Sequence, residues 1–472
     1  MKILYVTSEA APFAASGGLG DVMGALPPAV KAKGHEVSVI MPFYNTVKDV
    51  YRDNMEYVTD ITFMLSWRKT GATIYKHSFG DCTYYFVENH YYFDRSRLYG
   101  EYDDAERFAF FSRAVVEYML SSGDIPDVLH ANDWQTALSV IYLKTEYAYI
   151  EAFKKIKTVY TIHNIEYQGK FDSYILGDVF GIHNSHKEIL DFDGCINLMK
   201  GAIVTSDFVT TVSPNYAREL EYDFFAFGLS SVIKAAKHKL LGVINGIDYA
   251  AFSPECGGDI AVPYTAKNYK SGKAKNKAYL QEMLGLEVKK NVPLVAMITR
   301  LTAGKGIDLV LHVIEEILSE DVQLVVLGTG ESKYEQAFSE IATRYNNFKA
   351  LIKFDRALSK QIYAAADIFL MPSKSEPCGL AQMIACSYAT VPIVRSVGGL
   401  YDSIIPYGES SANGFRFDSY NAHDMLYTLK EAISLYKNKK DWNVLTASAR
   451  KSNFTWDSSA SKYIEIYNNL TL

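Results

Sequence analysis

Residues 2–33 of this 472-residue chain read KILYVTSEAAPFAASGGLGDVMGALPPAVKAK. An apolar, β-branched run at 3–7 is followed by a turn that contains Gly17 and Gly18, and then by a periodic segment at 19–33. These patterns are typical of a strand, a loop and a helix. Glycines in such a loop let backbone N–H groups approach an anion closely, and the start of a helix adds a favourable dipole. The stretch therefore predicts a strand–loop–helix unit with a phosphate-binding loop.

The pattern Gly-Gly-Leu-x-Asp of this loop, at 17–21, occurs again at 398–402. The second copy also follows an apolar run and opens a helix-like stretch. Either copy alone is also typical of an ordinary strand-to-helix turn. Because the two copies agree, we expect two phosphate-binding loops that hold a diphosphate between two domains.

Strand and helix patterns alternate along the chain and restart after Asn245-Gly246-Ile247-Asp248. Further strands are expected at 36–41, 127–130, 158–162, 208–212 and 240–244, and then at 293–298, 323–327, 368–371 and 391–394. Helices are expected at 105–120, 134–146, 306–318, 334–345 and 379–388. This order predicts two α/β domains, each with a parallel sheet covered by helices. Ligands bind beyond the carboxyl ends of such strands, so we expect the loops there to line a cleft.

The composition is that of a globular protein with two large domains, since 49% of the residues are hydrophobic and 22% are charged. No apolar run reaches the ~18 residues of a membrane span, and a strand begins directly after Met1, so we expect a cytoplasmic protein. A net charge of −6 gives no footprint for nucleic acid. The 35 tyrosines suit sugar binding, although an aromatic-rich core also explains them. The lysine-rich stretch 270–277 is expected to be a solvated helix entry.

The five cysteines, Cys82, Cys195, Cys256, Cys378 and Cys386, are scattered without a CxxC or Cys/His spacing. An odd number with this spacing argues against a disulfide framework and against a structural zinc. We therefore expect reduced thiols and no metal site.

A candidate carboxylate lies in the segment Ser373-Lys374-Ser375-Glu376-Pro377-Cys378-Gly379-Leu380, ahead of an expected helix. Pro377 fixes its own φ and restricts the backbone of Glu376, so the side chain can be held in one direction. Such a carboxylate can bind sugar hydroxyls or oppose positive charge that develops at an anomeric carbon. The alternative is a helix-capping or surface glutamate, which the helix dipole also favours.

Two cations, Arg300 and Lys305, lie in the expected loop between a strand and a helix of the second half. Arginine binds phosphate with a planar fork and lysine supplies a compact charge, a pairing suited to a leaving diphosphate. The alternative is a pair of surface cations. A Walker loop is excluded because Gly304-Lys305 is not followed by Ser or Thr. The dinucleotide pattern that begins at Gly328-Thr329-Gly330 fails because Lys333 replaces its last glycine.

His163 follows the expected strand at 158–162, where it can exchange a proton near a sugar or simply orient the sugar. A lone histidine at a strand end is more often structural. His130 and Asp133 are too sparse a set to indicate a metal site.

Together these stretches resemble the bacterial glycogen synthases and starch synthases, which transfer glucose from a sugar nucleotide to the end of an α-1,4-glucan. The resemblance runs from Lys2 to about Ile464. Its motifs are Ser8-Glu9, Gly17-Gly18-Leu19-Gly20-Asp21-Val22, His130-Ala131-Asn132-Asp133-Trp134-Gln135, Thr161-Ile162-His163-Asn164, Tyr167-Gln168-Gly169, Asn245-Gly246-Ile247-Asp248, Arg300-Leu301, Lys305-Gly306, Glu376-Pro377-Cys378-Gly379-Leu380 and Gly398-Gly399-Leu400. Chance agreement across so many ordered motifs is not credible, and the inference depends on these sites rather than on the fold.

The resemblance implies two Rossmann-like domains of the GT-B type that face a deep cleft. The expected parts are an acceptor-side domain at 1–246, a nucleotide-sugar-binding domain at 247–455 and a C-terminal helix at 456–472 that crosses back to the first domain. The implied reaction transfers glucose from ADP-glucose to the non-reducing end of an α-1,4-glucan, either glycogen or a malto-oligosaccharide, with retention of configuration. It needs no metal and no cofactor, since ADP-glucose is a substrate.

The family's site residues are carried over motif by motif. The resemblance implies that Glu376, His163, Arg300 and Lys305 are catalytic, with the two cations neutralising the diphosphate. It implies donor contacts from Ser16, Gly17, Gly18, Asn164, Asn245, Phe354, Cys378, Gly379, Leu380, Gly398, Gly399 and Leu400, with Phe354 stacking on adenine. It implies acceptor contacts from Phe93, Asp133, Trp134 and Tyr167.

Two positions bear on the mechanism. Many family members carry a lysine two residues before the first Gly-Gly-Leu, where this chain has Ala15, so we expect donor binding to depend more on Arg300 and Lys305. Related two-glutamate transferases have a second glutamate eight residues after the first, where this chain has Ile384. Front-face attack by the acceptor hydroxyl is therefore favoured over a covalent double displacement.

Two alternatives stay open. One is a transferase of the same fold that uses UDP-glucose, because stacking on Phe354 does not discriminate adenine from uracil. The other is a non-catalytic glucan-binding protein, which Ala15 suggests although Arg300, Lys305 and Glu376 are retained. A glucan phosphorylase shares the architecture but needs a pyridoxal cofactor.

Overall fold

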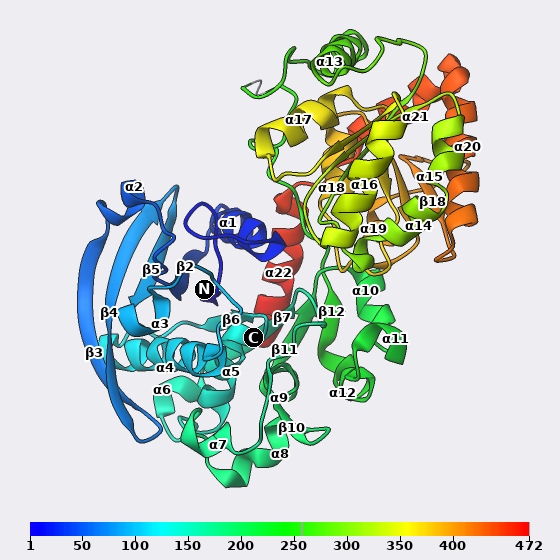
Figure 1. Cartoon of the computed structure of the whole chain (residues 1–472). Helices are drawn as coiled ribbons and strands as arrows, with labels where there is room; N and C mark the ends of the chain where they lie inside the picture. Colours follow the sequence, from blue (N-terminus) through cyan, green and yellow to red (C-terminus); the bar gives the residue numbers. More distant parts are fainter. Residues whose placement is uncertain (256–257, 472) are drawn as a thin grey trace. The chain divides into compact units, whose positions relative to one another are not determined.

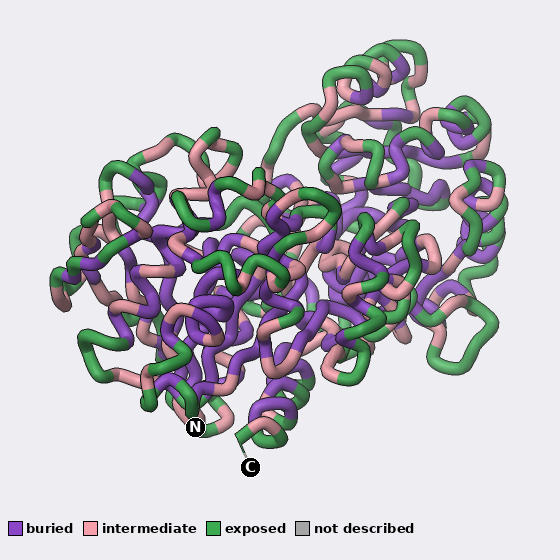
Figure 2. The backbone as a smooth tube through the Cα atoms, turned by 90° about the horizontal axis from the view of Figure 1, so that it is seen from below, coloured by how far each residue is buried: buried purple, intermediate pink, exposed green. Residues whose placement is uncertain are grey.

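The computed structural model describes residues 1–255 and 258–471, so Cys256 lies outside the described residues. The chain divides into two compact units (Figure 1). Unit 1 consists of Met1–Gly246 and Trp456–Leu472, and unit 2 consists of Ile247–Thr455. In both units buried residues run through the interior, whereas exposed residues lie on the outer helices and loops (Figure 2).

Unit 1 is built on a nine-stranded sheet with the strand order β12-β11-β7-β6-β1-β2-β5-β4-β3. These strands are β1 (Lys2–Val6), β2 (Glu36–Pro42), β3 (Glu56–Leu65), β4 (Arg68–Phe79), β5 (Cys82–Glu88), β6 (Val128–Asn132), β7 (Lys157–Ile162), β11 (Phe208–Thr211) and β12 (Leu240–Gly242). A separate small sheet contains β8 (Lys170–Phe171), β10 (Cys195–Asn197) and β9 (Asp191–Phe192). The helices are α1 (Gly18–Lys31), α2 (Asp49–Arg52), α3 (His90–Phe93), α4 (Asp104–Ser122), α5 (Ala137–Lys144), α6 (Glu151–Lys154), α7 (Ile175–Asp178), α8 (Lys187–Leu190), α9 (Leu198–Thr205), α10 (Pro214–Glu219), α11 (Asp223–Ala226), α12 (Ser230–Ala236) and α22 (Trp456–Thr471).

The large sheet is parallel from β12 to β5, but β4 pairs antiparallel with both β5 and β3. The sequence patterns do not predict β3, β4 or β5. Along most of these strands exposed or half-buried residues alternate with buried ones. A strand covered on one face lacks the continuous apolar run of a fully buried parallel strand, which explains why the three strands escape detection.

Helix α22 belongs to unit 1 through a buried chain of polar side chains. The hydroxyl of Tyr467 on this helix lies 2.9 Å from the hydroxyl of Tyr5 and 2.7 Å from Nδ1 of His130. Nε2 of His130 in turn lies 2.5 Å from Oγ1 of Thr161. Burial lowers the pKa of His130 to about 3, so its ring is neutral at physiological pH. The chain of hydrogen bonds fastens α22 to β1, β6 and β7.

Unit 2 contains a six-stranded parallel sheet with the order β15-β14-β13-β16-β17-β18. Its strands are β13 (Leu294–Ile298), β14 (Gln323–Leu327), β15 (Phe348–Leu351), β16 (Ile368–Met371), β17 (Val391–Arg395) and β18 (Phe415–Phe417). The helices are α13 (Tyr269–Met283), α14 (Ile307–His312), α15 (Ile314–Ser319), α16 (Ser332–Arg344), α17 (Arg356–Ala365), α18 (Ala381–Ser387), α19 (Gly398–Ser403), α20 (Ala422–Lys437) and α21 (Lys439–Lys451). The four central strands are predicted from the sequence, whereas the short edge strands β15 and β18 are not.

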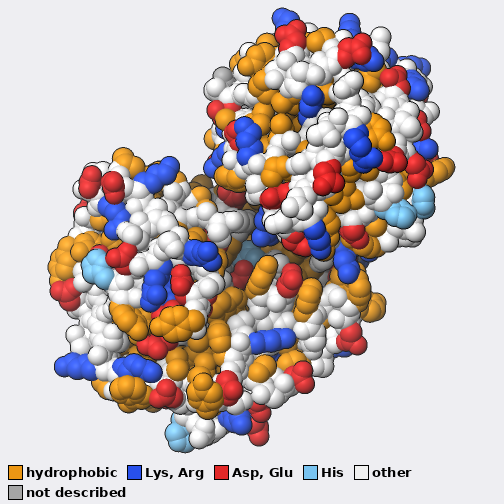
Figure 3. All heavy atoms as spheres, in the orientation of Figure 1, with side chains coloured by type: hydrophobic (Ala, Val, Ile, Leu, Met, Phe, Trp, Pro, Cys, Tyr) orange, Lys and Arg blue, Asp and Glu red, His pale blue; other side chains and the backbone are white. Residues whose placement is uncertain are grey.

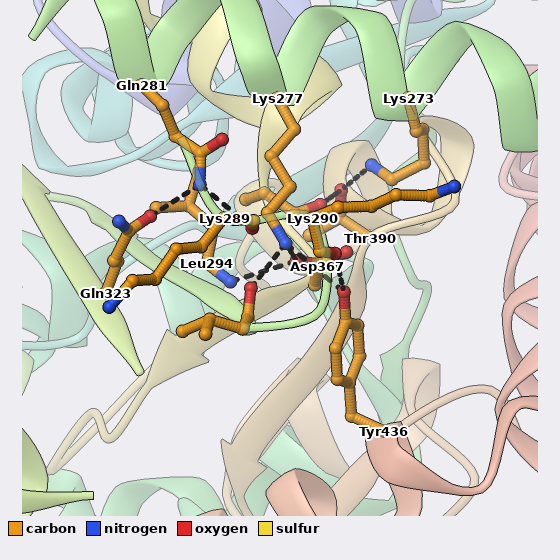
Figure 4. A network of polar contacts seen from close by, with 12 residues as sticks. Lys273, Lys277, Gln281, Lys289, Lys290, Leu294, Gln323, Asp367, Thr390 and Tyr436 are labelled. Carbon is orange, nitrogen blue, oxygen red and sulfur yellow. Dashed lines mark hydrogen bonds and ion pairs between the residues drawn. The ribbon is translucent and has the colours of Figure 1, made fainter. Parts of the chain in front are cut away.

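The expectation that the stretch 270–277 is solvated is wrong for two of its lysines. Lys273 and Lys277 on α13 are buried and point toward the sheet (Figure 4). Nζ of Lys273 donates to Oγ1 of Thr390 at 2.7 Å and to the carbonyl of Tyr388 at 3.1 Å. Burial lowers the pKa of Lys273 to about 7. The spacing of four places both lysines on the inner face of the helix, which a run of charges in the sequence conceals.

Lys277 holds together four elements of unit 2. Its Nζ donates to Oδ2 of Asp367 at 2.7 Å and to the hydroxyl of Tyr436 on α20 at 3.2 Å. The same Oδ2 accepts the backbone N–H of Leu294, the first residue of β13, at 2.9 Å. Since Asp367 directly precedes β16, this network ties α13 and α20 to the amino ends of two neighbouring strands (Figure 4).

We expect Asp367→Asn to lower the free energy of unfolding by about 3 kcal/mol, because it leaves the Lys277 ammonium buried without its counter-charge. Thermal and urea unfolding of the full chain would measure the loss. Glu315→Gln is the matched control, since it removes one partner of an exposed pair with Arg344 and should change stability by less than about 1 kcal/mol. Equal effects of the two substitutions would contradict the assignment.

Candidate active site

Unit 2 brings candidate residues from three loops to one edge of its sheet. Strands β13, β16 and β17 are neighbours and run parallel, so their carboxyl ends lie side by side. The loop after β13 carries Arg300 and Lys305, the loop after β16 carries Glu376, and the turn after β17 carries Gly398 and Gly399. Positions far apart in the sequence therefore meet because of the sheet order.

The centre of this arrangement is an ion pair between Lys305 and Glu376. Nζ of Lys305 lies 2.6 Å from Oε2 of Glu376, and the hydroxyl of Ser373 donates to the same oxygen at 3.0 Å. The carboxylate is buried, whereas the lysine side chain is partly exposed. A buried carboxylate with one cation and one hydroxyl as partners has a fixed position.

A close approach of two backbone segments makes this ion pair possible. Gly306 has a φ of 71°, and a Cβ there would overlap the carbonyl oxygen of Pro372. The backbone N–H of Lys374 donates to the carbonyl of Gly304 at 2.9 Å. Only glycine at position 306 therefore lets the loop that carries Lys305 lie against the loop that carries Glu376.

The second Gly-Gly pair packs directly on the turn of Glu376. Gly398 has a φ of 45°, and a Cβ there would overlap the carbonyl oxygen of Glu376. The N–H of Gly399 donates to the carbonyls of Glu376 and Pro377, both at 3.1 Å. Close packing of two loops thus accounts for these glycines, a reason that the sequence pattern alone does not reveal. Leu400 is fully buried in the first turn of α19.

Gln382 on α18 holds the rest of this turn and is not among the residues expected at the site. Its Nε2 donates to the carbonyl of Cys378 at 3.1 Å and to the carbonyl of Gly379 at 3.0 Å. Gly379 has a φ of 71°, which favours glycine, and Leu380 begins α18 as its N-cap. Its position four residues after Cys378, about one helical turn, is the sequence feature that indicates this contact.

Arg300 and Phe354 are exposed, in contrast to Glu376. The Arg300 side chain has no hydrogen bond or ion pair within the described ranges. Phe354 is 89% exposed and lies directly before Asp355, the N-cap of α17. Both side chains are accessible to a ligand, and nothing in the packing of unit 2 accounts for an aromatic residue at position 354.

Unit 1 places three polar residues after its central strands. Strands β1, β6 and β7 are neighbours, and the segments that follow them carry Glu9, Asp133 and His163. Asn132 is the last residue of β6, and its side-chain Nδ2 donates to the carbonyl of Val6 at 3.1 Å. A second group of candidate residues therefore lies at the carboxyl ends of these strands.

Glu9 holds the first Gly-Gly loop, although it is not among the residues expected at the site. Its carboxylate accepts the N–H of Ser16 at 2.5 Å, the hydroxyl of Ser16 at 2.7 Å and the N–H of Gly17 at 3.3 Å. The hydroxyl of Tyr99 donates to it at 2.7 Å. Two N–H groups of the expected phosphate-binding loop are thus bound by a buried glutamate, while Gly17 and Gly18 stay exposed.

His163 is neutral, and its tautomer is fixed by its neighbours. Nε2 lies 2.9 Å from Oδ1 of Asn132. The side-chain Nδ2 of Asn132 donates to the carbonyl of Val6, which identifies the other atom of the amide, Oδ1, as the acceptor. Nε2 therefore carries the proton, and Nδ1 is the acceptor nitrogen. Burial lowers the pKa of His163 to about 3, so the ring is uncharged at physiological pH.

Asp133 has a strained backbone and an unusual carboxyl group. Its φ of 56° with a ψ of 178° is a region that glycine normally occupies. Oδ1 accepts the N–H of His163 at 2.8 Å, and the N–H of Asn164 also bonds to the carboxylate. Burial nevertheless raises the pKa of Asp133 to about 7. The strain is the kind that surrounding structure maintains at functional sites.

The other candidates of unit 1 differ in exposure. Tyr167 is exposed and Trp134 is partly exposed. Phe93, by contrast, is 1% exposed and packs against Tyr44 and Phe110 in the aromatic core. Its ring has no face left for a sugar, which argues against the expected acceptor contact from Phe93.

Asn245, which follows β12, has a buried Oδ1 without a hydrogen-bond partner among the described residues. An unsatisfied buried acceptor is costly unless a ligand or water supplies a donor. Asn164 is partly exposed and caps its own turn, because its Oδ1 accepts the N–H of Glu166 at 3.0 Å. Of these two side chains, Asn245 has the polar atom that still needs a partner, whereas Oδ1 of Asn164 is satisfied within its own turn.

Among the described residues, Cys82, Cys195 and Cys386 are free thiols, and Cys378 is buried. Within the described ranges, no group of three or more His, Cys, Asp or Glu side chains is placed to hold a metal ion. None of the helices found in residues 1–255 and 258–471 combines the length and the apolar character of a membrane span.

Comparisons with known proteins agree with this arrangement over the whole chain. The family model for the starch synthase catalytic domain matches residues 2–235, and the model for glycosyl transferases group 1 matches residues 283–448. Glycogen synthases of Alkaliphilus metalliredigens and of Streptococcus equi subsp. equi are each 44% identical, over 475 and 476 residues, with 100% of both chains covered. The chain belongs to the glycogen synthase and starch synthase family.

A solved member of this family has the same fold. The catalytic domain of starch synthase IV from Arabidopsis thaliana, bound to ADP and acarbose, superimposes with a TM-score of 0.90 at 33% identity. The match covers 100% of this chain and 99% of the other. The predictions of two Rossmann-like domains with the GT-B fold and of a glucosyltransferase are confirmed. The roles of individual residues and the domain boundaries stay predictions.

We expect Glu376→Gln to lower kcat for glucose transfer by about 10²–10³-fold, because removing one preorganised charge from a developing ion costs about 3–4 kcal/mol. The KM for the donor should change less than about threefold. Steady-state release of the nucleoside diphosphate measures both. Glu331→Gln is the matched control, since Glu331 contacts the N–H of Ala303 in the same loop as Lys305. An unchanged kcat in Glu376→Gln would remove this residue from the reaction.

Glu9→Gln should raise the KM for the donor by about tenfold with a smaller change in kcat. The neutral amide accepts hydrogen bonds less strongly than the carboxylate that holds Ser16 and Gly17, a difference of about 1.5 kcal/mol. Tyr99→Phe, which removes only one donor to Glu9, should have a smaller effect. If both variants bind the donor as the parent chain does, the first Gly-Gly loop has no part in donor binding.

Proposed function

We propose that this member of the family is a glycogen synthase that transfers glucose from ADP-glucose to the non-reducing end of an α-1,4-glucan with retention of configuration. The ion pair between Lys305 and Glu376 carries the proposal. In this proposal the lysine would neutralise a diphosphate and the adjacent carboxylate would bind a sugar, so the pair supports both roles. The ADP bound to the starch synthase IV domain supports an adenine nucleotide as donor.

The proposed step separates charge. The anomeric carbon becomes positive as it leaves the diphosphate, which gains negative charge. Arg300 and Lys305 would stabilise the diphosphate, and Glu376 would stabilise the sugar, so both partners of the transition state meet a fixed opposite charge. Since Ile384 supplies no second carboxylate, the acceptor hydroxyl would attack from the face that the diphosphate leaves.

The neutral groups of unit 1 would bind sugar hydroxyls. Nδ1 of His163 is the acceptor nitrogen of an uncharged ring and would accept a hydrogen bond from one sugar hydroxyl. Oδ1 of Asn245 would accept a hydrogen bond from another hydroxyl. Asp133, Trp134 and Tyr167 remain the proposed acceptor contacts. Residues 1–246 would thus provide the acceptor side.

Unit 2 would hold the nucleotide sugar. The exposed ring of Phe354 would stack on the base, and the backbone at Cys378, Gly379 and Leu380 would bind the glucose. The turn at 398–400 would complete the donor contacts, as would Ser16, Gly17, Gly18 and Asn164 of unit 1. We also propose a cytoplasmic location, where the thiols of Cys82, Cys195 and Cys386 would stay reduced.

The test is an assay of nucleoside diphosphate release with glycogen as acceptor and with ADP-glucose or UDP-glucose as donor. We expect kcat/KM for ADP-glucose to exceed that for UDP-glucose by more than tenfold, because the ADP bound to the starch synthase IV domain supports adenine. A preference for UDP-glucose would overturn the donor assignment. Glycogen binding without release from either donor would indicate the non-catalytic alternative.

A further inference from the structure

Arg395, the last residue of β17, binds the loop that carries Glu376. Nη1 of its guanidinium group donates to the carbonyl of Lys374 at 2.7 Å and to the carbonyl of Ser373 at 3.4 Å. Both carbonyls belong to the loop after β16, and the hydroxyl of Ser373 donates to the carboxylate of Glu376. Arg395 therefore holds the backbone of a residue whose side chain binds that carboxylate.

Tyr420 connects this arginine with the loop that carries Lys305. The guanidinium carbon of Arg395 lies 5.5 Å from the centroid of the Tyr420 ring, within the range of a cation–π contact. The hydroxyl of Tyr420 donates to Oδ1 of Asp308 at 2.6 Å and to the carbonyl of Ala303 at 3.4 Å. Ala303 precedes Lys305 by two residues, and Asp308 lies in the first turn of α14. The two side chains thus join the loop after β13 to the loop after β16.

The hydrophobic core of unit 2 fixes the position of Tyr420. Its partly buried ring packs against that core. Burial, and after it the hydrogen bond to Asp308, raises the pKa of the tyrosine hydroxyl, so the hydroxyl keeps its proton and is the donor to the carboxylate. Through this ring, Arg395 and both loops are held relative to the core.

The pairing of β17 does not explain an arginine at position 395. The register pairs Arg395 with Phe417 of β18 through the backbone, whatever the side chain. Cationic and anionic side chains are interspersed over the face of unit 2 that Figure 3 shows, so no excess of negative charge on that face calls for another cation. What distinguishes Arg395 is that its hydrogen bonds go to the backbone of the loop of Glu376.

We propose that Arg395 and Tyr420 are positioning residues for glucose transfer, which hold the loops of Lys305 and Glu376 at the separation that the reaction needs. The proposal rests on the proposed function, which assigns the diphosphate to Lys305 and the sugar to Glu376. Arg395 and Tyr420 act through backbone carbonyls and do not touch the substrate. A displacement of about 1 Å in such a loop can cost about 10²-fold in rate.

The first test is the steady-state kinetics of nucleoside diphosphate release with ADP-glucose and glycogen. We expect Arg395→Gln to lower kcat by about 10–100-fold and to change the donor KM by less than about threefold, because it displaces a reacting group without removing a substrate contact. Arg395→Lys keeps the charge and one donor and should restore kcat to within about threefold of the parent chain. Tyr420→Phe, which loses only the hydroxyl, should lower kcat by about fivefold.

Two results of these assays would overturn the proposal. One is an unchanged kcat in Arg395→Gln. The other is a large rise of the donor KM at an unchanged kcat, which would mean that Arg395 contacts the donor directly.

Arg450 is the matched control for a loss of stability. Its Nη1 donates to the carbonyl of Ser387 at 2.7 Å, and its guanidinium carbon lies 5.9 Å from the centroid of the Tyr264 ring. These contacts resemble those of Arg395 but lie at the end of α18, not at the two loops of the ion pair. Arg450→Gln should lower the unfolding temperature at least as much as Arg395→Gln and leave kcat within about twofold of the parent chain. Equal losses of kcat in the two variants would contradict a positioning role.

A double substitution tests whether Arg395 acts through Glu376. In Glu376→Gln the carboxylate that must be positioned is already gone, so adding Arg395→Gln should lower kcat by less than about threefold more. If the two losses multiply, Arg395 acts by another route and the proposal fails.

Hydrogen exchange tests the same contacts without any transfer activity. The N–H of Lys374 donates to the carbonyl of Gly304, so its exchange reports whether the two loops lie together. We expect exchange in the peptide that contains Lys374 to be at least about tenfold faster in Arg395→Gln and unchanged in Arg450→Gln. Unchanged exchange in Arg395→Gln would overturn the proposal. If the parent chain transfers no glucose from either donor, the proposed function fails, but this experiment still decides whether Arg395 holds the loops.

Discussion

The arrangement of unit 2 depends on one ion pair, the 2.6 Å contact between Lys305 and Glu376. A buried carboxylate without a partner would be costly, so the loop after β13 and the loop after β16 must approach closely enough for the pair to form. Glycine at 306 removes the side chain that would block this approach, and Gly398 does the same for the turn after β17. The positions of the glycines are thus consequences of the need to bring opposite charges together at one edge of a sheet.

The two Gly-Gly-Leu copies show how one sequence pattern serves two physical purposes. In unit 2 the glycines are buried against the turn of Glu376, and the N–H of Gly399 holds that turn. In unit 1 Gly17 and Gly18 are exposed, and the carboxylate of Glu9 fixes the loop by accepting the N–H groups of Ser16 and Gly17. A pattern that looks symmetrical in the sequence therefore gives one rigid support in unit 2 and one accessible loop in unit 1.

The ordered motifs made the α/β class, the central strands and the family predictable, because fully buried parallel strands leave continuous apolar runs and the loop residues follow them directly. The sequence did not reveal features that depend on packing in three dimensions. Strands β3 to β5 are covered on one face, so their pattern is weak. Lys273 and Lys277 look like a solvated charge run but face the interior, and Phe93 looks like an available ring but fills the core. The role of Glu9 depends on a loop that returns to it, which spacing cannot show.

The two units treat charge in opposite ways, and this difference fits the chemistry of glucosyl transfer. In unit 1, burial keeps His163 and His130 neutral and raises the pKa of Asp133 to about 7, while the carboxylate of Glu9 is bound by the N–H groups of Ser16 and Gly17. Unit 2 keeps a full ion pair at its edge and an exposed arginine in the same loop as the lysine. Charge develops on the donor during the reaction, while the acceptor oxygen begins in a neutral hydroxyl and ends in a neutral glycosidic bond. Fixed charges are useful only where charge appears, and elsewhere they would bind water and counter-ions in competition with an uncharged sugar.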